Sequence, residues 1–411
     1  MYTRWSFRIL TVLALIVVLS LLISACGGEQ SAAPTAPEGS LQSTAVQAEG
    51  EKEPYRIGVI NSLTGTYAAG GESMKAGYMA ALKLFSDQGG IDGRPVEIIE
   101  VDDESNPEIS SRAVERLAEQ GVPLIVGPAY TPTSYAAEAA AQRLQVPMIS
   151  MSGAYKPSDG NKWAWAPSPH MDAALAKYTE YSRDKGLTAI ATLSSTDALG
   201  DVGEEEFNEL FAGNPDLKRV AQERVNIQGI EFTPQLMKVK ASNPDIVYTY
   251  ISGTALYQIR KQMDQVGLEN TPMIIAMGNV TNESKRVMSE YRPGSVLYVS
   301  GKVVVADLLP DSDPLKGINV RVTESIKAGS GRDPEGTSLY GYDPMLVALE
   351  ALKGAGPDRQ AIKSWLENNA KGIVGLAGKY NLSKDDRIGL HDPESMTVIY
   401  IDENQNWAIA E

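Results

Sequence analysis

The chain has few of the residues on which catalysis and covalent cross-linking depend. It has one cysteine, Cys26, in 411 residues, so it cannot form an intramolecular disulfide, and no second thiolate is present to share a metal ion. Its two histidines, His170 and His391, lie in no H-E-x-x-H motif, and the G-x-S-x-G and P-loop patterns are absent. These absences argue against a zinc site and against the common hydrolase motifs. We therefore expect no enzyme, no metal and no cofactor, and a hydrolytic enzyme on an α/β scaffold is the weakest alternative.

Positive charge is also scarce. The chain has 37 Lys and Arg residues against 52 Asp and Glu residues, which gives a formal net charge of −15 at pH 7. An acidic surface repels nucleic acid and anionic lipid, so we expect neither as a partner of the folded body. The balance fits a protein of an extracytoplasmic space.

The N-terminus contains the longest apolar run. Residues 9–23 are almost wholly apolar and follow Arg4 and Arg8, a length that suits a signal-peptide core better than a membrane span of about 20 residues. The run ends in "ISAC", which resembles the bacterial lipobox. That resemblance implies a signal peptide over residues 1–25 and lipidation of Cys26; an ordinary signal anchor with an incidental cysteine is the alternative.

The next segment, residues 26–54, is rich in small, polar, proline and glutamate residues. It has almost nothing to bury, so we expect a disordered tether. Together with the lipid on Cys26, it would hold the folded body at the outer face of the cell membrane or in the periplasm.

From Tyr55 onward, short apolar runs alternate with amphipathic segments, a pattern typical of parallel strands joined by helices. The first expected strands are "YRIGVI", "PVEIIEVD", "PLIVG" and "VPMISM", and the second group is "TAIATLSS", "KRVAQERV", "DIVYTYIS", "PMIIAM" and "SVLYVSG". The expected helices cover residues 71–87, 107–120, 132–144, 203–212, 233–241, 254–266, 282–290, 314–328, 338–353 and 358–369. Two closing strands lie in "ESMTVIYIDENQNWAIA". The sequence thus predicts an α/β fold with two doubly wound lobes, because residues 55–411 are too many for one compact core.

Two loops follow neighbouring strands at the edge where such sheets bind ligands. In the first, Thr131 is a suitable N-cap and Pro132 suits the first helical position, which predicts free amide groups and hydroxyls at a helix N-terminus. In the second, Ser152, Gly153 and Ala154 are small enough for a ligand to approach the backbone. The loops together predict an anion-binding site, and plain helix capping is the alternative for each alone.

The chain resembles the solute-binding proteins of bacterial ABC importers, specifically the branched-chain amino acid type. The resemblance rests on "IGVINSLTGTYAAGG", "GGIDGRPVEIIEVDDESNPEISSRAVERLAEQGVPLIVGP", "VPMISMSGA" and "GYDPMLVALEAL", and it covers nearly all of residues 55–411. It implies a type I periplasmic binding protein with two lobes, a hinge of three crossings and a ligand cleft between the lobes. Lobe I would comprise residues 55–169 and 303–375, and lobe II residues 170–302 and 376–411, with crossings near 167–171, 300–305 and 374–379.

The same resemblance implies which residues hold the ligand. Its carboxylate would be bound by Tyr130, Thr131, Gly153, Ala154 and Tyr155. Other candidates in or near the cleft are Tyr67, Thr133, Ser152, Leu199, Met277 and Tyr340, and Ser252 and Thr254 are added because they follow a predicted strand.

The chain departs from the family where amino acid binders contact the ligand. Gly70 stands where they usually have an aromatic residue, with Tyr67 close by, and Leu199 replaces a second aromatic. Met277 stands where an acid should pair with the ligand's ammonium group, which is costly to bury unpaired. Either Asp197 or Glu283 replaces that acid or, as we favour, the ligand lacks a free α-amino group.

Two tryptophans, Trp163 and Trp165, precede the first crossing, and we expect them to pack in the structure rather than contact ligand. The resulting hypothesis is a monomeric extracytoplasmic receptor that traps a small solute with a carboxylate or similar head (an amino acid, amide or aromatic acid) and delivers it to an ABC permease. A ligand-sensing module for a membrane receptor is the alternative, because it would use the same trap.

Overall fold

The computed structural model describes residues 53–275 and 277–410. Cys26, the expected signal peptide and most of the expected tether lie outside the described residues. In the part of the chain that is described, no helix combines the length and apolar character needed to cross a membrane.

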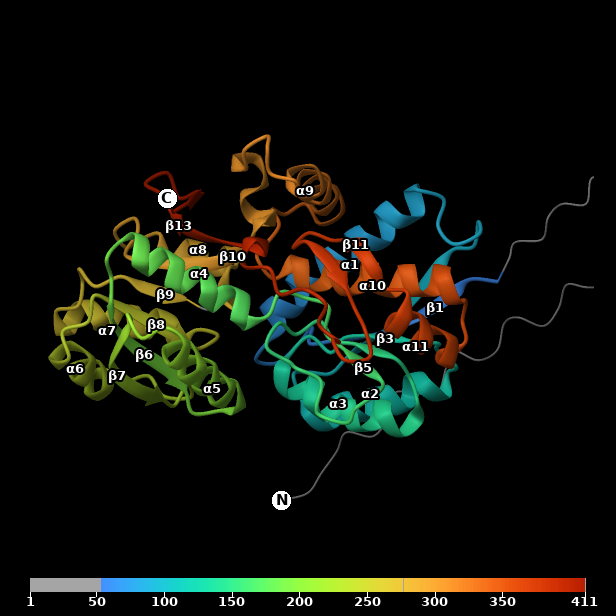
Figure 1. Cartoon of the computed structure of the whole chain (residues 1–411), viewed down its shortest axis with the longest axis horizontal. Helices are drawn as coiled ribbons and strands as arrows, with labels where there is room; N and C mark the ends of the chain where they lie inside the picture. Colours follow the sequence, from blue (N-terminus) through green and yellow to red (C-terminus); the bar gives the residue numbers. More distant parts are fainter. Residues whose placement is uncertain (1–52, 276, 411) are drawn as a thin grey trace, which may run out of the picture. The chain divides into compact units, whose positions relative to one another are not determined.

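The first sheet has five strands in the order β2-β1-β3-β4-β5, all parallel. They are β1 (Tyr55–Asn61), β2 (Val96–Asp102), β3 (Ile125–Val126), β4 (Met148–Ile149) and β5 (Ala164–Trp165). The helices that pack with this sheet or with one another are α1 (Ala68–Asp87), α2 (Pro107–Glu119), α3 (Thr131–Leu144), α9 (Lys316–Ser330), α10 (Ser338–Ala355) and α11 (Arg359–Asn368). Figure 1 shows α2 and α3 on one side of this sheet and α1 and α10 on the other. We call this group of elements the first lobe.

The second sheet has seven strands in the order β14-β13-β10-β9-β8-β6-β7. They are β6 (Ala189–Ser195), β7 (Lys218–Val225), β8 (Ile246–Tyr250), β9 (Met273–Ile275), β10 (Val296–Gly301), β13 (Met396–Ile401) and β14 (Trp407–Ile409). Its helices are α4 (Met171–Asp184), α5 (Ala198–Gly213), α6 (Thr233–Ala241), α7 (Ala255–Val266) and α8 (Asn282–Met288). The short helices η1 (Met277–Asn279) and η2 (Lys302–Leu308) follow β9 and β10, and η3 (Pro393–Ser395) precedes β13. This group is the second lobe.

The central strands of both sheets, such as β3, β4, β8 and β9, are buried on both faces, which explains why they read as continuous apolar runs. In β8, Ile246 and Tyr248 pack in the cluster that contains Phe207 of α5, whereas Val247 packs with Leu236 of α6. Alternation of side chains along a strand thus places neighbouring residues in two different cores. The prediction of α/β lobes is confirmed, with β13 and β14 antiparallel at one edge of the second sheet.

The third crossing lies later in the chain than expected. The strands β11 (Lys371–Val374) and β12 (Lys379–Asn381) pair as a small antiparallel sheet, so residues 374–379 form a hairpin instead of a crossing. The buried carboxylate of Asp343 on α10 accepts hydrogen bonds from the Leu376 amide at 2.7 Å, the Ala377 amide at 3.1 Å and the Tyr380 hydroxyl at 2.6 Å. The assignment of residues 376–390 to the second lobe is therefore wrong, and the chain passes to β13 through residues 391–395.

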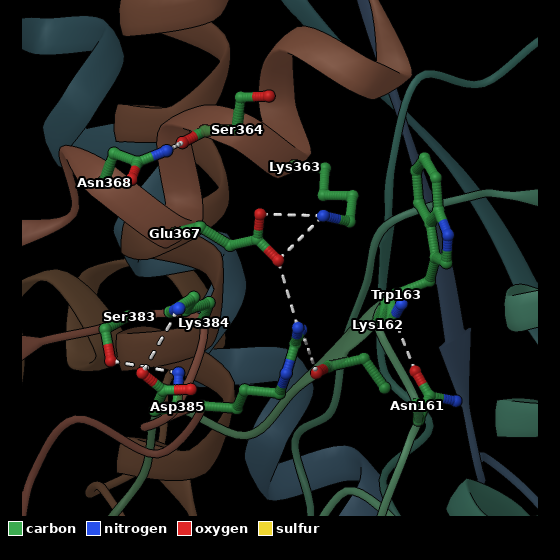
Figure 2. A network of polar contacts seen from close by, with 12 residues as sticks. Asn161, Lys162, Trp163, Lys363, Ser364, Glu367, Asn368, Ser383, Lys384 and Asp385 are labelled. Atoms are coloured by element: carbon green, nitrogen blue, oxygen red, sulfur yellow. Dashed lines mark hydrogen bonds and ion pairs between the residues drawn. The ribbon is translucent and has the colours of Figure 1, made fainter.

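An ion-pair network holds the end of this segment to the first lobe. Glu367 of α11 pairs with Lys363 at 2.7 Å and with Arg387 at 3.1 Å, and Figure 2 shows the Glu367 carboxylate facing Lys363. Lys363 lies over the Trp163 ring at 5.8 Å, and Arg387 lies over the Trp165 ring at 4.6 Å. Both tryptophans are buried, so they pack structurally, as predicted.

Candidate ligand-binding cavity

A small cavity lies where loops of the first lobe meet loops of the second. The volume of the cavity is about 60 Å³, several times the roughly 10–15 Å³ that a single water molecule needs. Its lining comes from segments that follow strands of both sheets and from the start of α10. The lining residues are Tyr67, Met74, Ala129, Tyr130, Thr131, Ser152, Gly153, Ala154, Met171, Leu199, Tyr250, Ser252, Met277, Gly278, Thr337 and Tyr340.

Most residues singled out in the sequence converge on this cavity. They are Tyr67, Tyr130, Thr131, Ser152, Gly153, Ala154, Leu199, Ser252, Met277 and Tyr340. Three others do not line it. The Thr133 hydroxyl donates to the Tyr130 carbonyl at 2.9 Å, the Tyr155 ring packs edge-on against Tyr135 at 5.0 Å, and Thr254 precedes α7.

Sequence reasoning missed six of the lining residues, namely Met74, Ala129, Met171, Tyr250, Gly278 and Thr337. Tyr250 ends β8 and Gly278 lies shortly after β9, so the strand-end rule that selected Ser252 could have found both. Thr337 immediately precedes α10, as Thr131 was expected to precede its helix. Met74 and Met171 are helical residues of α1 and α4, and their sequence pattern resembles that of any core position.

The two predicted loops meet because β3 and β4 are neighbours in the sheet, with Ile125 opposite Met148. The Thr131 and Ser152 hydroxyls lie 2.7 Å apart and share a hydrogen bond, which joins one loop to the other. The prediction that Thr131 is the N-cap of α3 is wrong, because Thr131 is the first residue of the helix. The N-cap is Tyr130, which makes no side-chain capping bond. The first amides of a helix lack partners within it, so the start of α3 offers donors for an anion at the cavity wall.

Tyr67 takes the place of the aromatic side chain missing at Gly70. A Cβ atom built on Gly70 would come within 2.5 Å of the Tyr67 ring, so this ring already occupies the space into which a residue at position 70 would project. The Tyr67 ring also stacks on Tyr130 with 5.1 Å between centroids and 19° between planes. The cavity therefore keeps an aromatic wall that a different residue supplies.

Tyr340 forms a second aromatic wall and bridges the two lobes. A Cβ atom on Gly153 would come within 2.5 Å of the Tyr340 ring, so only glycine leaves room for the ring where it lies. The Tyr340 hydroxyl donates to the Met277 Sδ at 3.0 Å. This contact joins α10 of the first lobe to η1 of the second across the cavity.

The cavity is electrically neutral. None of the described residues that line it has a charged side chain, and burial raises the pKa values of the Tyr67, Tyr130 and Tyr340 phenols above their ordinary range. Asp197 instead caps α5 by accepting from the Gly200 amide at 3.1 Å. Glu283 is half-exposed and pairs with Arg286 at 2.7 Å. Neither proposed replacement for the missing acid lines the cavity.

The fold and cavity together define a class of two-lobed binding proteins, and comparison with known proteins gives the family. Residues 54–406 match the periplasmic binding protein family, and the chain belongs to it. A Leu/Ile/Val-binding protein homolog 1 from Brucella abortus is 24% identical over 310 residues, covering 73% of this chain and 78% of the relative. An amino acid binding protein from Pseudomonas aeruginosa is 24% identical over 333 residues, covering 76% of this chain and 82% of the relative.

Solved structures share the fold at low sequence identity. An extracellular ligand-binding receptor from Rhodopseudomonas palustris superposes with a TM-score of 0.77 at 23% identity, covering 88% of this chain and 100% of the other. The substrate-binding protein of a branched-chain amino acid transporter from Streptococcus pneumoniae, solved with isoleucine, has a TM-score of 0.71 at 19% identity, covering 87% of this chain and 99% of the other. Because the family consists of solute-binding proteins, this chain is a binding protein of extracytoplasmic type.

Proposed function

We propose that this chain is an extracytoplasmic receptor that traps a small carboxylate-bearing solute between its lobes and delivers it to an ABC permease. The observation that carries the proposal is the junction of two loops at the cavity wall, where the Thr131 and Ser152 hydroxyls share a hydrogen bond beside the uncapped start of α3. Amide and hydroxyl donors that converge without any acidic side chain suit a carboxylate.

The energetics of such a seat are sufficient for tight binding. Hydrogen bonds to a charged group contribute roughly 1.5–3 kcal/mol each. Three or four of them supply most of the roughly 8 kcal/mol of a micromolar complex. Contact with the Tyr67 and Tyr340 rings adds apolar stabilisation, which ordering of the solute and closure of the lobes partly offset.

The solute lacks a free α-amino group. An ammonium group needs an acidic partner when it is buried, and the described cavity lining has none. Met277, only 5% exposed, stands where the family resemblance implies the acid, and its sulfur accepts the Tyr340 hydroxyl instead. The Brucella and Pseudomonas relatives are named for amino acids, so the proposal places this chain among receptors for small acids or amides related to them.

Several contacts between the lobes support closure on the ligand. Lys156, in the loop after β4, pairs with the buried Glu206 of α5. The Asn282 amide donates to the Glu335 carboxylate at 2.7 Å, and the Gly336 amide donates to the Val280 carbonyl at 2.8 Å. A solute that touches both lobes only when these contacts form shifts the population toward the closed state.

The proposal extends to how the receptor is held at the cell. A signal peptide over residues 1–25 directs export, and a lipid on Cys26 anchors the chain while residues 26–54 act as the tether. The receptor acts as a monomer at the outer face of the cell membrane or in the periplasm.

A thermal-shift screen of the purified chain tests the binding function. Carboxylic acids, the corresponding amides and amino acids are compared at saturating concentration, and a bound solute raises the melting temperature by mass action. Thr131→Val should weaken binding of any acid that responds, whereas Thr133→Val is the matched control because Thr133 does not line the cavity and its hydroxyl already donates to the Tyr130 carbonyl. An unchanged melting temperature with every acid, or equal affinity in both variants, would refute the proposed carboxylate-binding site.

A further inference from the structure

Among the described residues, two residues that line the cavity carry a buried hydroxyl group without a hydrogen-bond partner. Tyr250 is 1% exposed and Thr337 is fully buried. Within the described part of the chain, neither the Tyr250 Oη nor the Thr337 Oγ1 makes a hydrogen bond. Both residues line the cavity, Tyr250 from the second lobe and Thr337 from the first.

The surrounding structure holds both side chains in place without using their hydroxyls. The Tyr250 ring packs edge-on against Phe207, with 6.0 Å between centroids, and fills the space that a side chain at Gly203 would occupy. Thr337 is the N-cap of α10 but makes no side-chain capping bond, although threonine at this position usually caps with its hydroxyl. Buried polar groups are nearly always hydrogen-bonded, so two unused hydroxyls on residues that line one cavity point to a ligand group.

These hydroxyls differ from those of Thr131 and Ser152. Thr131 and Ser152 already share a hydrogen bond beside α3. A hydroxyl both donates and accepts, and burial keeps the Tyr250 phenol protonated by raising its pKa well above the ordinary value. Such groups match a hydroxyl, carbonyl or amide, and they offer no charge to an ammonium group.

We propose that Tyr250 and Thr337 form an uncharged polar subsite that binds a hydroxyl or carbonyl group of the solute. This inference rests on the proposed function, in which the loops near Thr131 and Ser152 bind the carboxylate. The cavity is small, so the second polar group lies within a few bonds of the carboxylate. The solute class is therefore a small hydroxy or oxo acid, in which an oxygen replaces the amino group of an amino acid.

Isothermal titration calorimetry with two matched series of acids tests the subsite. The first series is isocaproate, α-hydroxyisocaproate, α-ketoisocaproate and leucine; the second is hydrocinnamate, phenyllactate, phenylpyruvate and phenylalanine. In at least one series, the hydroxy or oxo acid should bind about five- to tenfold more tightly than the unsubstituted acid, as expected for one or two neutral hydrogen bonds. The amino acid should bind more weakly than either oxygenated acid.

Hydroxyl deletions then assign the preference to these residues. Tyr250→Phe and Thr337→Val should each lower the affinity for the oxygenated acid by a larger factor than the affinity for the unsubstituted acid, so the preference falls, whereas Thr337→Ser should retain it. Tyr178→Phe is the matched control, because its phenol is also buried and unpartnered among the described residues but does not line the cavity.

The outcomes separate the subsite from the proposed function. Three results would overturn the subsite and leave the proposed carboxylate-binding site unaffected. They are binding without preference for an oxygen substituent, a preference for the amino acid, and a preference that survives both deletions. If no acid of either series binds, the proposed function itself fails.

Discussion

The replacement of Gly153 by alanine tests whether the Tyr340 ring is a wall of the ligand cavity. An added Cβ atom would lie 2.5, 2.9 and 3.2 Å from three atoms of the Tyr340 ring, whereas ordinary contacts begin near 3.4 Å. The ring must therefore withdraw by about 0.9 Å, the difference between 3.4 and 2.5 Å. Tyr340 is only 3% exposed, so the ring can withdraw only by displacing packed neighbours or by entering the cavity, and either movement disturbs its hydrogen bond to Met277.

The size of the effect follows from the cost of overpacking. Forcing an extra carbon into a filled site costs about 1–3 kcal/mol. If this strain falls on the closed, liganded state, affinity drops by about 5- to 150-fold. Gly153 does not have a left-handed backbone conformation, so alanine adds no backbone strain and the effect is purely steric.

Titration of wild type and Gly153→Ala with α-ketoisocaproate and phenylpyruvate measures the loss. Gly213→Ala is the matched control, because no atom lies within 4 Å of the Cβ that it adds, and we expect its affinity to equal that of wild type. Differential scanning calorimetry reports strain in the free protein. If Gly153→Ala keeps wild-type affinity, whatever its melting temperature, then Tyr340 does not shape the bound state.

Three further predictions follow from buried groups. Burial raises the pKa of Asp343 from 3.8 to about 6, so the folded chain holds this proton more tightly than the unfolded chain. The free energy of unfolding therefore falls by about 3 kcal/mol from this group as pH rises through 6. Denaturant titrations across pH should show a shallower fall in Asp343→Asn than in wild type, and identical profiles would contradict the assignment. Met277→Glu places a carboxylate at the cavity, where it can pair with the ammonium group of an amino acid. Calorimetry should show that the affinity for leucine relative to α-ketoisocaproate rises by at least about tenfold. An unchanged ratio of these two affinities would mean that Met277 does not face the solute. Lys156→Ala leaves the buried Glu206 unpaired and should destabilise the chain by about 3 kcal/mol. The double variant Lys156→Ala, Glu206→Gln should be destabilised less, because it no longer buries an unpaired charge. A double-mutant cycle with zero coupling energy would exclude this link between the lobes.

Much of the fold could be predicted because buried strands appear as apolar runs and amphipathic helices show a helical periodicity of apolar residues. The helix at residues 233–241 is observed with the predicted limits, and the loops at the ends of β3 and β4 lie together as parallel neighbours must. The start of α3 was misplaced by one residue because Thr131 bonds across to Ser152 instead of capping the helix. No pattern of neighbouring residues reports that choice of partner.

The third crossing could not be read from the sequence for a similar reason. Residues 376–390 stay with the first lobe because one buried carboxylate, Asp343, accepts their amides and the Tyr380 hydroxyl. These partners are more than thirty residues apart. The replacement at Gly70 is local by contrast, since the Tyr67 ring reaches this space from only three residues earlier, and the sequence already places Tyr67 close to Gly70.

The most direct test of the central claim is a crystal structure of the chain bound to the acid with the highest affinity in the calorimetric series. We expect the solute in the cavity, with its carboxylate oxygens about 2.7–3.2 Å from donors of the loops at Thr131 and Ser152. A solute bound elsewhere, or bound in the cavity with its carboxylate turned away from these loops, would contradict the account.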